Sequence, residues 1–285
     1  MSTRPSWESL RDRWPNAAAS RFVDAAGLRW HVQTLGAGPA LLLLHGSGGA
    51  THTWRDLLPL LAERFAVVAP DLPGHGFTTR PAAERLSLDA MASDLRALLD
   101  TLDVAPAGIV GHSAGGALAL RLAADRAPRA VVGINAALTP PNALFSFAAP
   151  ALQAVVGSGL VGELTAALAD SELAFDTLMR STGSRISAEQ RALYRAFARS
   201  SDHAGAVMTM FSRWDLASLG RRLPEMHTPV TLVVGDRDGW VRPSEAERVA
   251  RRLPDARVVT LAGAGHLAHE EQPERTAAIV ADALT

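Results

Sequence analysis

Gly108-Ile109-Val110-Gly111-His112-Ser113-Ala114-Gly115-Gly116 is the stretch of this chain that decides its fold. A short apolar run leads into the pattern Gly-x-Ser-x-Gly at residues 111–115, and an alanine-rich segment, Ala117–Ala124, follows. A strand, a sharp turn and a helix form the context in which this pattern marks a nucleophilic serine. Glycines at both ends of the pattern remove side chains that would collide in the turn. We therefore expect strained backbone at Ser113, with its hydroxyl held above the edge of a sheet.

Strand and helix patterns alternate on both sides of this stretch. Short apolar runs bounded by turn residues are typical of buried strands, and apolar residues at helical spacing are typical of the covering helices. The predicted strands are Arg21–Ala25, Leu28–Thr34, Ala40–Leu44, Ala66–Ala69, Ala107–Val110, Ala130–Asn135, Val230–Val234 and Arg257–Leu261. The predicted helices of this part include Thr53–Leu61, Ser87–Leu102, Ser244–Leu253 and Pro273–Leu284. The pattern predicts an α/β fold, with a mostly parallel sheet and helices on both of its faces.

The alternation stops between residues 138 and 223, where helical runs dominate and no strand pattern stands out. We predict three parts: an N-terminal extension over 1–20, an α/β core over 21–137 and 224–285, and a helical lid over 138–223. Ligands of such sheets bind at the carboxyl ends of the strands. Because the insertion leaves from the end of the Ala130–Asn135 strand, we expect the lid to cover that edge.

Composition excludes several classes of chemistry. The 285 residues carry a net charge of −1, so nucleic acid is not an expected partner. There is no cysteine, and all 28 basic residues are arginine, which removes thiolate chemistry, disulfides and Schiff bases. No cluster indicates a metal or a cofactor. No apolar run has the length of a membrane span and residues 1–20 do not resemble a signal peptide, so we expect a soluble, cytoplasmic protein.

A serine nucleophile needs a base and an acid that orients the base. His266 is the predicted base, because it stands on a glycine-rich turn directly after the last predicted strand. Asp238 is the predicted acid, with Asp236 as its nearer rival, since both follow the Val230–Val234 strand. The rival carboxylate would instead pin its loop. Asn135 follows another strand, but an amide cannot stabilise an imidazolium as a carboxylate does, so we leave it out.

The third requirement is a pair of donors for the oxyanion of the transition state. The Ala114 N–H, next to the nucleophile, is one predicted donor. The loop over residues 45–49 supplies the other, which we assign to the Ser47 N–H, with His45 supporting the loop. The glycine-rich loop lacks a lysine and the spacing of a phosphate loop. Gly46, His112 and Trp240 are the predicted pocket residues.

These motifs together resemble the α/β-hydrolase superfamily over residues 20–285. The motifs are His-Gly at 45–46, Asp-Leu-Pro-Gly-His-Gly at 71–76, Gly-His-Ser-Ala-Gly at 111–115, Gly-Asp-Arg-Asp at 235–238 and Gly-His at 265–266. The resemblance implies the fold and the triad of Ser113, Asp238 and His266, but is nearly silent on substrate. A serine at 113 argues against haloalkane dehalogenases and epoxide hydrolases, whose nucleophile is aspartate.

A narrower resemblance, to the magnesium-chelatase accessory α/β-hydrolases of phototrophic bacteria, is carried by segments outside the triad motifs. They are Trp14-Pro15-Asn16, Arg29-Trp30-His31-Val32-Gln33, Gly133-Ile134-Asn135-Ala136-Ala137 and Gly183-Ser184-Arg185-Ile186. This resemblance implies a functional association with magnesium chelatase in bacteriochlorophyll synthesis. The small-molecule substrate would then be a tetrapyrrole or its ester.

Three functions follow from these patterns. The first is a lidded serine hydrolase acting on an ester-like bond. The second is a non-catalytic accessory protein that holds a tetrapyrrole for magnesium insertion. The third is a carbon–carbon bond hydrolase or a general carboxylesterase, because residues 45–50 resemble ring-cleavage hydrolases, although those have proline where Gly49 stands. The arginines of the predicted lid at 180, 185, 191, 195 and 199 either pair with ligand carboxylates or are solvated.

Overall fold

An eight-stranded sheet forms the centre of the protein. The computed structural model describes residues 4–139 and 160–285. Residues 1–3 of the predicted extension and 140–159 of the predicted lid lie outside the described residues. The strand order is β1-β2-β4-β3-β5-β6-β7-β8, in which β1, β2 and β4 pair antiparallel and all other neighbours are parallel. The strands are β1 Ser20–Ala25, β2 Leu28–Leu35, β3 Ala40–Leu44, β4 Ala66–Pro70, β5 Gly108–His112, β6 Ala130–Ile134, β7 Val230–Gly235 and β8 Ala256–Leu261. The predicted fold class is confirmed.

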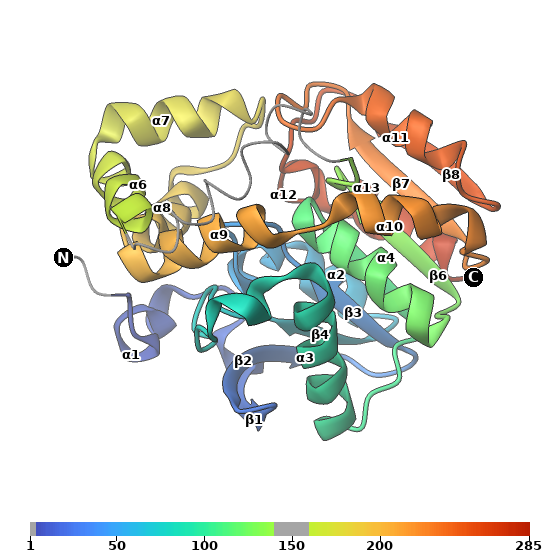
Figure 1. Ribbon diagram of the computed structural model, residues 1–285, viewed down its shortest axis with the longest axis horizontal. Coiled ribbons are helices and arrows are strands. Elements are labelled where there is room, and N and C mark those ends of the chain that lie inside the picture. Colours follow the sequence, from blue (N-terminus) through green and yellow to red (C-terminus); the bar gives the residue numbers. More distant parts are fainter. Residues whose placement is uncertain (1–3, 140–159) are drawn as a thin grey trace.

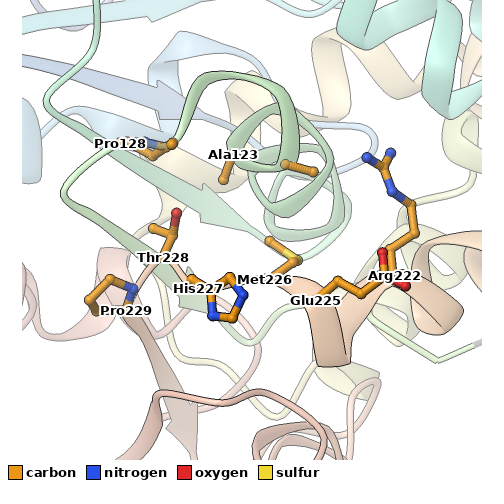
Figure 2. Close-up of a pocket in the computed structure, with 10 residues that line it drawn as sticks. Ala123, Pro128, Arg222, Glu225, Met226, His227, Thr228 and Pro229 are labelled. Carbon is orange, nitrogen blue, oxygen red and sulfur yellow. The ribbon is translucent and has the colours of Figure 1, made fainter.

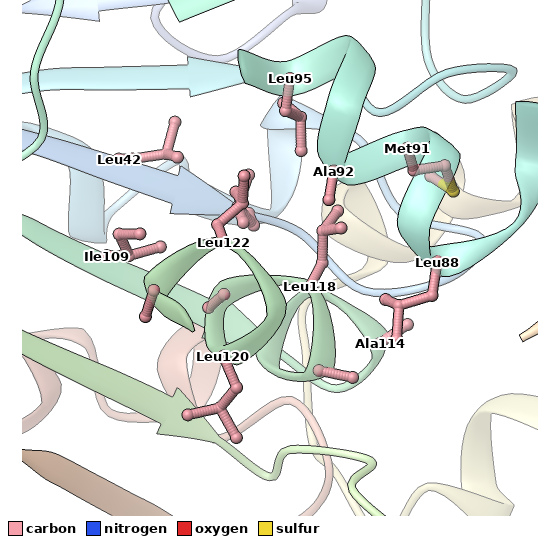
Figure 3. Packing of buried hydrophobic residues seen from close by; sticks show 14 of the residues in the cluster. Leu42, Leu88, Met91, Ala92, Leu95, Ile109, Ala114, Leu118, Leu120 and Leu122 are labelled. Carbon is pink, nitrogen blue, oxygen red and sulfur yellow. The ribbon is translucent and has the colours of Figure 1, made fainter. Parts of the chain in front are cut away.

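Two hydrophobic layers form because successive residues of a strand point to opposite faces. Leu42 of β3 and Ile109 of β5 belong to one layer, while Leu41 and Val110 belong to the other. Helices α3 (Leu88–Thr101), α4 (Ala114–Arg126) and α11 (Pro243–Ala250) cover the first face. Helices α2 (Leu57–Ala62) and α13 (Pro273–Ala283) cover the second face. Figure 3 shows side chains of α3 and α4 meeting over β3 and β5 in the first layer.

Helices α6–α10 stand between β6 and β7, although these two strands are direct neighbours in the sheet. They are α6 Leu160–Asp170, α7 Glu172–Ser181, α8 Ala188–Ala198, α9 Ser201–Arg213 and α10 Leu216–Arg222. In Figure 1, α6 and α7 lie beyond the strands at the upper left, with α9 crossing below them. We call α6–α10 the inserted helices. Ser187 and Gln190 form a capping box at the start of α8, in which each side chain hydrogen-bonds the backbone N–H of the other residue.

The structure differs from the predicted local elements in several places. The predicted helix Thr53–Leu61 is a 3₁₀ turn at Thr51–Trp54 followed by α2. Ser87 occupies the N-cap of α3, but its side chain makes no capping hydrogen bond. Three short helices were not predicted: α1 (Trp7–Leu10), α10 and α12 (Ala268–Glu271). Because α12 directly follows His266, it matters for the site.

The N-terminal segment packs against an inserted helix. Leu10 and Trp14 form a small buried cluster with Leu193 and Phe197 of α8. The Trp14 indole N–H donates a 3.2 Å hydrogen bond to Thr51 Oγ1 in the loop that follows the predicted oxyanion segment. The segment therefore joins α8 to the core.

Candidate active site

Ser113 occupies the turn between β5 and α4, with φ 50° and ψ −116°. This left-handed φ is costly for a residue with a Cβ and persists only where the surroundings enforce it. The Ser113 N–H donates to the Ile134 carbonyl at 2.9 Å, and the Ser113 carbonyl accepts from Gly116 and Ala137 N–H groups at 3.0 Å each. A side chain at Gly115 would overlap the Leu44 carbonyl, so α4 can start this close to β3 only with glycine there.

His266 and Asp238 lie together in the fold, as the sequence predicts. His266 Nδ1 and Asp238 Oδ2 are 2.9 Å apart, and both side chains are buried. Asp238 Oδ1 accepts from the Trp240 and Val241 N–H groups at 2.7 and 2.9 Å. With its second oxygen held this way, Asp238 presents Oδ2 to the imidazole. The contact fixes the proton on Nδ1 and leaves Nε2 free to act as a base.

The rival acid, Asp236, has a different partner. It is exposed, and its Oδ1 accepts from the Gly263 N–H at 2.7 Å. Asp236 therefore ties the β7–α11 loop to the turn after β8, which is the pinning role predicted for whichever carboxylate is not the acid.

The Ser113 hydroxyl makes no hydrogen bond within the part of the chain that the structure describes. Ser113 lies beside Gly46, where an added Cβ would come within 3.1 Å of the serine Cβ and 2.7 Å of His112 Nδ1. His266 lines the same cavity as Gly46. Catalytic hydrogen bonds of a serine are often long in free enzymes and tighten when substrate binds. The structure therefore brings His266 and Asp238 together and places Ser113 beside Gly46, which lines the same cavity as His266, without a serine–histidine hydrogen bond.

The predicted oxyanion donors flank this position. Neither the Ser47 N–H nor the Ala114 N–H donates a hydrogen bond to a described residue, so both remain available. His45 supports the loop as predicted, since its Nδ1 lies 2.8 Å from the Gly46 carbonyl and its Nε2 accepts from the Leu72 N–H at 2.9 Å.

Asn135 holds three loops together at the end of β6. Its Nδ2 donates to the carbonyls of Gly265 and His266 at 2.8 and 2.7 Å, while its Oδ1 accepts from the Gly235 N–H at 2.7 Å. An amide, which both donates and accepts, can satisfy all these partners, whereas a carboxylate could not donate. Asn135 thus positions the loops that carry the candidate acid and base.

A turn between α7 and α8, residues 181–185, contacts the same two loops, and we call it the clamp turn. The Thr182 carbonyl accepts from the His266 N–H at 2.9 Å and from the Gly239 N–H at 3.3 Å. Ser184 Oγ accepts from the Leu267 N–H at 2.8 Å. The inserted helices are therefore directly hydrogen-bonded to the segments that carry Asp238 and His266.

A second connection between the inserted helices and the site is the buried Glu270 on α12. Tyr194 Oη of α8 donates to Glu270 Oε1 at 2.7 Å, and Gln190 Nε2 donates to Oε2 at 3.2 Å. Burial raises the pKa of Glu270 to about 8, although both hydrogen bonds favour its charged form. The carboxyl group is therefore mostly protonated at neutral pH.

Glu270→Gln is expected to remove a pH dependence of stability. Between its ordinary pKa of 4.5 and about 8, the folded chain keeps a proton on Glu270 that the unfolded chain releases. The contribution of Glu270 to the free energy of unfolding therefore falls as pH rises through that range. At about 1.4 kcal/mol per pKa unit, the total fall is a few kcal/mol. Urea unfolding at pH 5, 7 and 9 measures it, with the exposed Glu274→Gln as control. The Glu270→Gln variant should gain stability relative to wild type as pH rises; parallel curves for the two proteins would contradict the assignment.

Most histidines of the chain are buried, and burial lowers the pKa of several of them, which favours the neutral imidazole. Burial, with neighbouring His269 and His266, holds the pKa of His112 well below 6.5, and its Nε2 lies 2.9 Å from the His266 carbonyl. Burial also lowers the pKa of His203 strongly. His112 ends β5 and touches the candidate base loop, so it supports His266 rather than acting as a second base.

A cavity of about 280 Å³ opens over these residues. The predicted pocket residues Gly46, His112 and Trp240 all line it, together with Ser47 and His266. Trp240 is 47% exposed, with its ring centroid 5.0 Å from that of His266 and its indole N–H donating to Ser181 Oγ at 2.9 Å. Sequence reasoning missed His203 and Glu270. Histidines are scattered along this chain, and nothing in the sequence indicates which of them faces a cavity.

A larger hollow, of about 450 Å³, lies elsewhere (Figure 2). Pro128 and Pro229, which line it, precede β6 and β7, so it opens at the amino ends of these strands. Ligands of parallel sheets bind at the opposite, carboxyl ends, where Ser113 lies. We therefore place the candidate site in the smaller cavity.

Two further observations concern the described residues. No group of three or more His, Asp or Glu side chains among them has the arrangement of a metal site. No helix among them is long and apolar enough to cross a membrane.

A family model, curated relatives and solved structures all show similarity to this chain. A model of the α/β hydrolase fold matches residues 39–273. The magnesium-chelatase 30 kDa subunit of Rhodobacter capsulatus is 36% identical over 97% of this chain and 98% of its own length. The 2-hydroxy-6-oxo-2,4-heptadienoate hydrolase of Pseudomonas putida is 39% identical, over only 38% of this chain and 40% of its own length. An α/β hydrolase fold protein from Burkholderia ambifaria superposes with a TM-score of 0.75 at 26% identity, covering 92% of this chain and 99% of that structure.

Proposed function

The chain belongs to the α/β hydrolase fold family, in the group of the magnesium-chelatase 30 kDa subunit, and from that premise we propose that it is a lidded serine hydrolase of an ester-like bond. The observation that carries the proposal is the 2.9 Å contact between His266 and Asp238 beside a strained Ser113 on the β5–α4 turn. Nucleophile, base and acid follow in the chain order of this fold.

The residues would act as follows. Ser113 Oγ attacks the ester carbonyl, and His266 Nε2 accepts the serine proton while Asp238 stabilises the imidazolium. The N–H groups of Ser47 and Ala114 hydrogen-bond the developing oxyanion. His266 then gives its proton to the departing alcohol. Water activated by His266 hydrolyses the acyl-enzyme and restores Ser113.

A fluorophosphonate probe tests this proposal directly. Ser113 Oγ would attack phosphorus, expel fluoride and form a stable serine–phosphorus bond. We expect labelling of the wild-type protein at one site and none of Ser113→Ala. An unlabelled wild type, or a labelled alanine variant, would refute a serine nucleophile at 113.

The full-length relative favours a second candidate function. We propose a functional association with magnesium chelatase, in which the chain either processes a tetrapyrrole ester or holds a tetrapyrrole without cleaving it. Absorbance titration with protoporphyrin and its magnesium form tests binding. Saturable binding that Ser113→Ala retains, together with unimpaired pigment synthesis in cells carrying only that variant, would favour the non-catalytic role. Absence of binding at tens of micromolar would count against it.

The partial relative from Pseudomonas putida favours a carbon–carbon bond hydrolase more weakly, because it matches well under half of either chain. The location in the cytoplasm stays a prediction, as do the division into extension, core and lid and the lid role of α6–α10.

A further inference from the structure

The walls of the candidate cavity carry unusually little charge. Among the described residues that line it, none is arginine, aspartate or glutamate. Apart from His203, the side chains that α7 and α9 contribute to the wall are apolar or nearly so, and the large ones are Phe175, Leu178, Met179, Val207, Met208 and Phe211. Tyr194 reaches the cavity with its hydroxyl already donated to Glu270. A charged ligand group would therefore find no countercharge here.

Of the five arginines that the sequence left open as carboxylate partners, four contact other groups of the inserted helices. Arg191 pairs with Asp176, and Arg199 pairs with Asp170. Arg195 donates to the carbonyls of Ala169 and Asp170. Arg180 pairs with Asp176 at 3.8 Å, and Arg185 is exposed. None of the five lines the cavity.

Three polar side chains among the described wall residues have buried atoms without a hydrogen-bond partner: Ser47 at Oγ, His112 at Nδ1, and His203, which lies on the inserted helix α9 away from the candidate triad motifs, at both ring nitrogens. His203 of α9 is 1% exposed, lines the cavity, and has no hydrogen bond of normal geometry at either ring nitrogen. Its ring packs against those of His75 and Phe197, with centroids 5.1 and 5.3 Å away. Burial lowers the pKa of His203 strongly, and the Gly48 carbonyl nearby offsets little of this. A neutral imidazole can donate one hydrogen bond and accept another, and buried polar groups normally have such partners.

From this lining we propose that the substrate of the Ser113 site is an uncharged ester. Its apolar part fills the cavity, and it carries an uncharged carbonyl, ether or hydroxyl group that His203 binds. The inference rests on the proposed serine hydrolase and names its substrate class. A carboxylate at the same depth would be desolvated without a partner, which costs far more than the apolar contacts return. Substrates that would place a free carboxylate inside the cavity are therefore excluded, and His203 determines specificity.

Matched fluorophosphonates test the charge selectivity. Two probes share one chain length, and one ends in a methyl group while the other ends in a carboxylate. We expect the neutral probe to label wild-type Ser113 at least about 100-fold faster. Met208→Arg adds a cation to the cavity wall, so we expect it to reduce the ratio of the neutral-probe labelling rate to the carboxylate-probe labelling rate at least about 10-fold. Met208→Leu adds no charge and should leave this ratio unchanged.

The outcomes separate the two claims. Similar rates for both probes in the wild type would overturn the uncharged substrate class and leave the serine hydrolase intact. Failure of both probes to label would overturn the hydrolase, and this inference with it.

A third probe, with a ketone in the middle of the tail, tests His203. His203→Phe keeps a ring for packing but removes both nitrogens. We expect it to slow labelling by the ketone probe about 10-fold relative to the plain alkyl probe, because the buried ketone loses its donor. The side-chain amide of glutamine can still donate a hydrogen bond, so His203→Gln should recover part of the labelling rate of the ketone probe relative to the alkyl probe. An unchanged ratio in His203→Phe would remove His203 from substrate binding, even if the overall rate falls through altered packing.

Discussion

Ser113→Ala is expected to lower kcat for a neutral ester about 10⁶-fold with little change in KM. The substitution removes the atom that forms the covalent bond, while the cavity and the oxyanion donors remain. In enzymes whose triad acts as one unit, loss of the serine or of the histidine alone removes nearly all triad catalysis. His266→Ala should therefore cost a similar factor, and the double variant should be hardly slower than either single one.

Steady-state kinetics with a p-nitrophenyl alkanoate and urea unfolding check this result together. Alanine meets the same left-handed φ of 50° that serine meets, so the free energy of unfolding should hardly change. Activity within 100-fold of wild type in a folded Ser113→Ala protein would contradict the assignment. Additive losses in the double variant would show that serine and histidine do not work as a pair.

Asp238→Asn should lower kcat about 10⁴-fold in a folded protein. Oδ1 of Asp238 accepts two backbone hydrogen bonds, from Trp240 and Val241, so asparagine would keep its carbonyl oxygen there. Its NH₂ group would then face His266 Nδ1, which must become an acceptor. The proton moves to Nε2, where it blocks the base, and a wrong tautomer of this kind is known to cost about four orders of magnitude.

Asp236→Asn is the matched control for this variant. Asp236 stands two residues away on the same loop, and its contact to the Gly263 N–H survives the change because asparagine still accepts. Its kcat should stay within about threefold of wild type. A large loss for Asp236→Asn, with a small one for Asp238→Asn, would reverse the choice of acid. At higher pH the Asp238→Asn protein should recover little, since the tautomer and not a protonation state limits it.

The sheet and the identity of the candidate triad could be predicted because both are local patterns. Each strand is an apolar run such as Ala40–Leu44, and each candidate catalytic residue follows such a run within a few positions. Asp238 could be ranked only against Asp236, because two carboxylates on one loop differ in direction rather than in sequence. The 2.9 Å contact to His266 separates them.

What escaped prediction depends on contacts between distant segments. Glu270 follows His266 by four residues and looks like an ordinary surface carboxylate, yet its partners Gln190 and Tyr194 lie about 80 and 76 positions away. His203 acquires its buried position through packing of α9 on the loop after β4. Asn135 was set aside as an acid on chemical grounds, but its three hydrogen bonds, to two separate loops, have no signature in the chain.

The clamp turn sets a boundary for any attempt to exchange the inserted helices between relatives. Gly183, Gly239 and Gly265 face one another across this contact, and a Cβ on any of them would overlap the opposing backbone. A chimera cut only where the chain leaves β6 and re-enters β7 would separate the turn from the loops it fits. The transplantable module is therefore the inserted helices together with residues 236–240 and 263–267, and glycine should be retained at all three positions wherever this contact is kept.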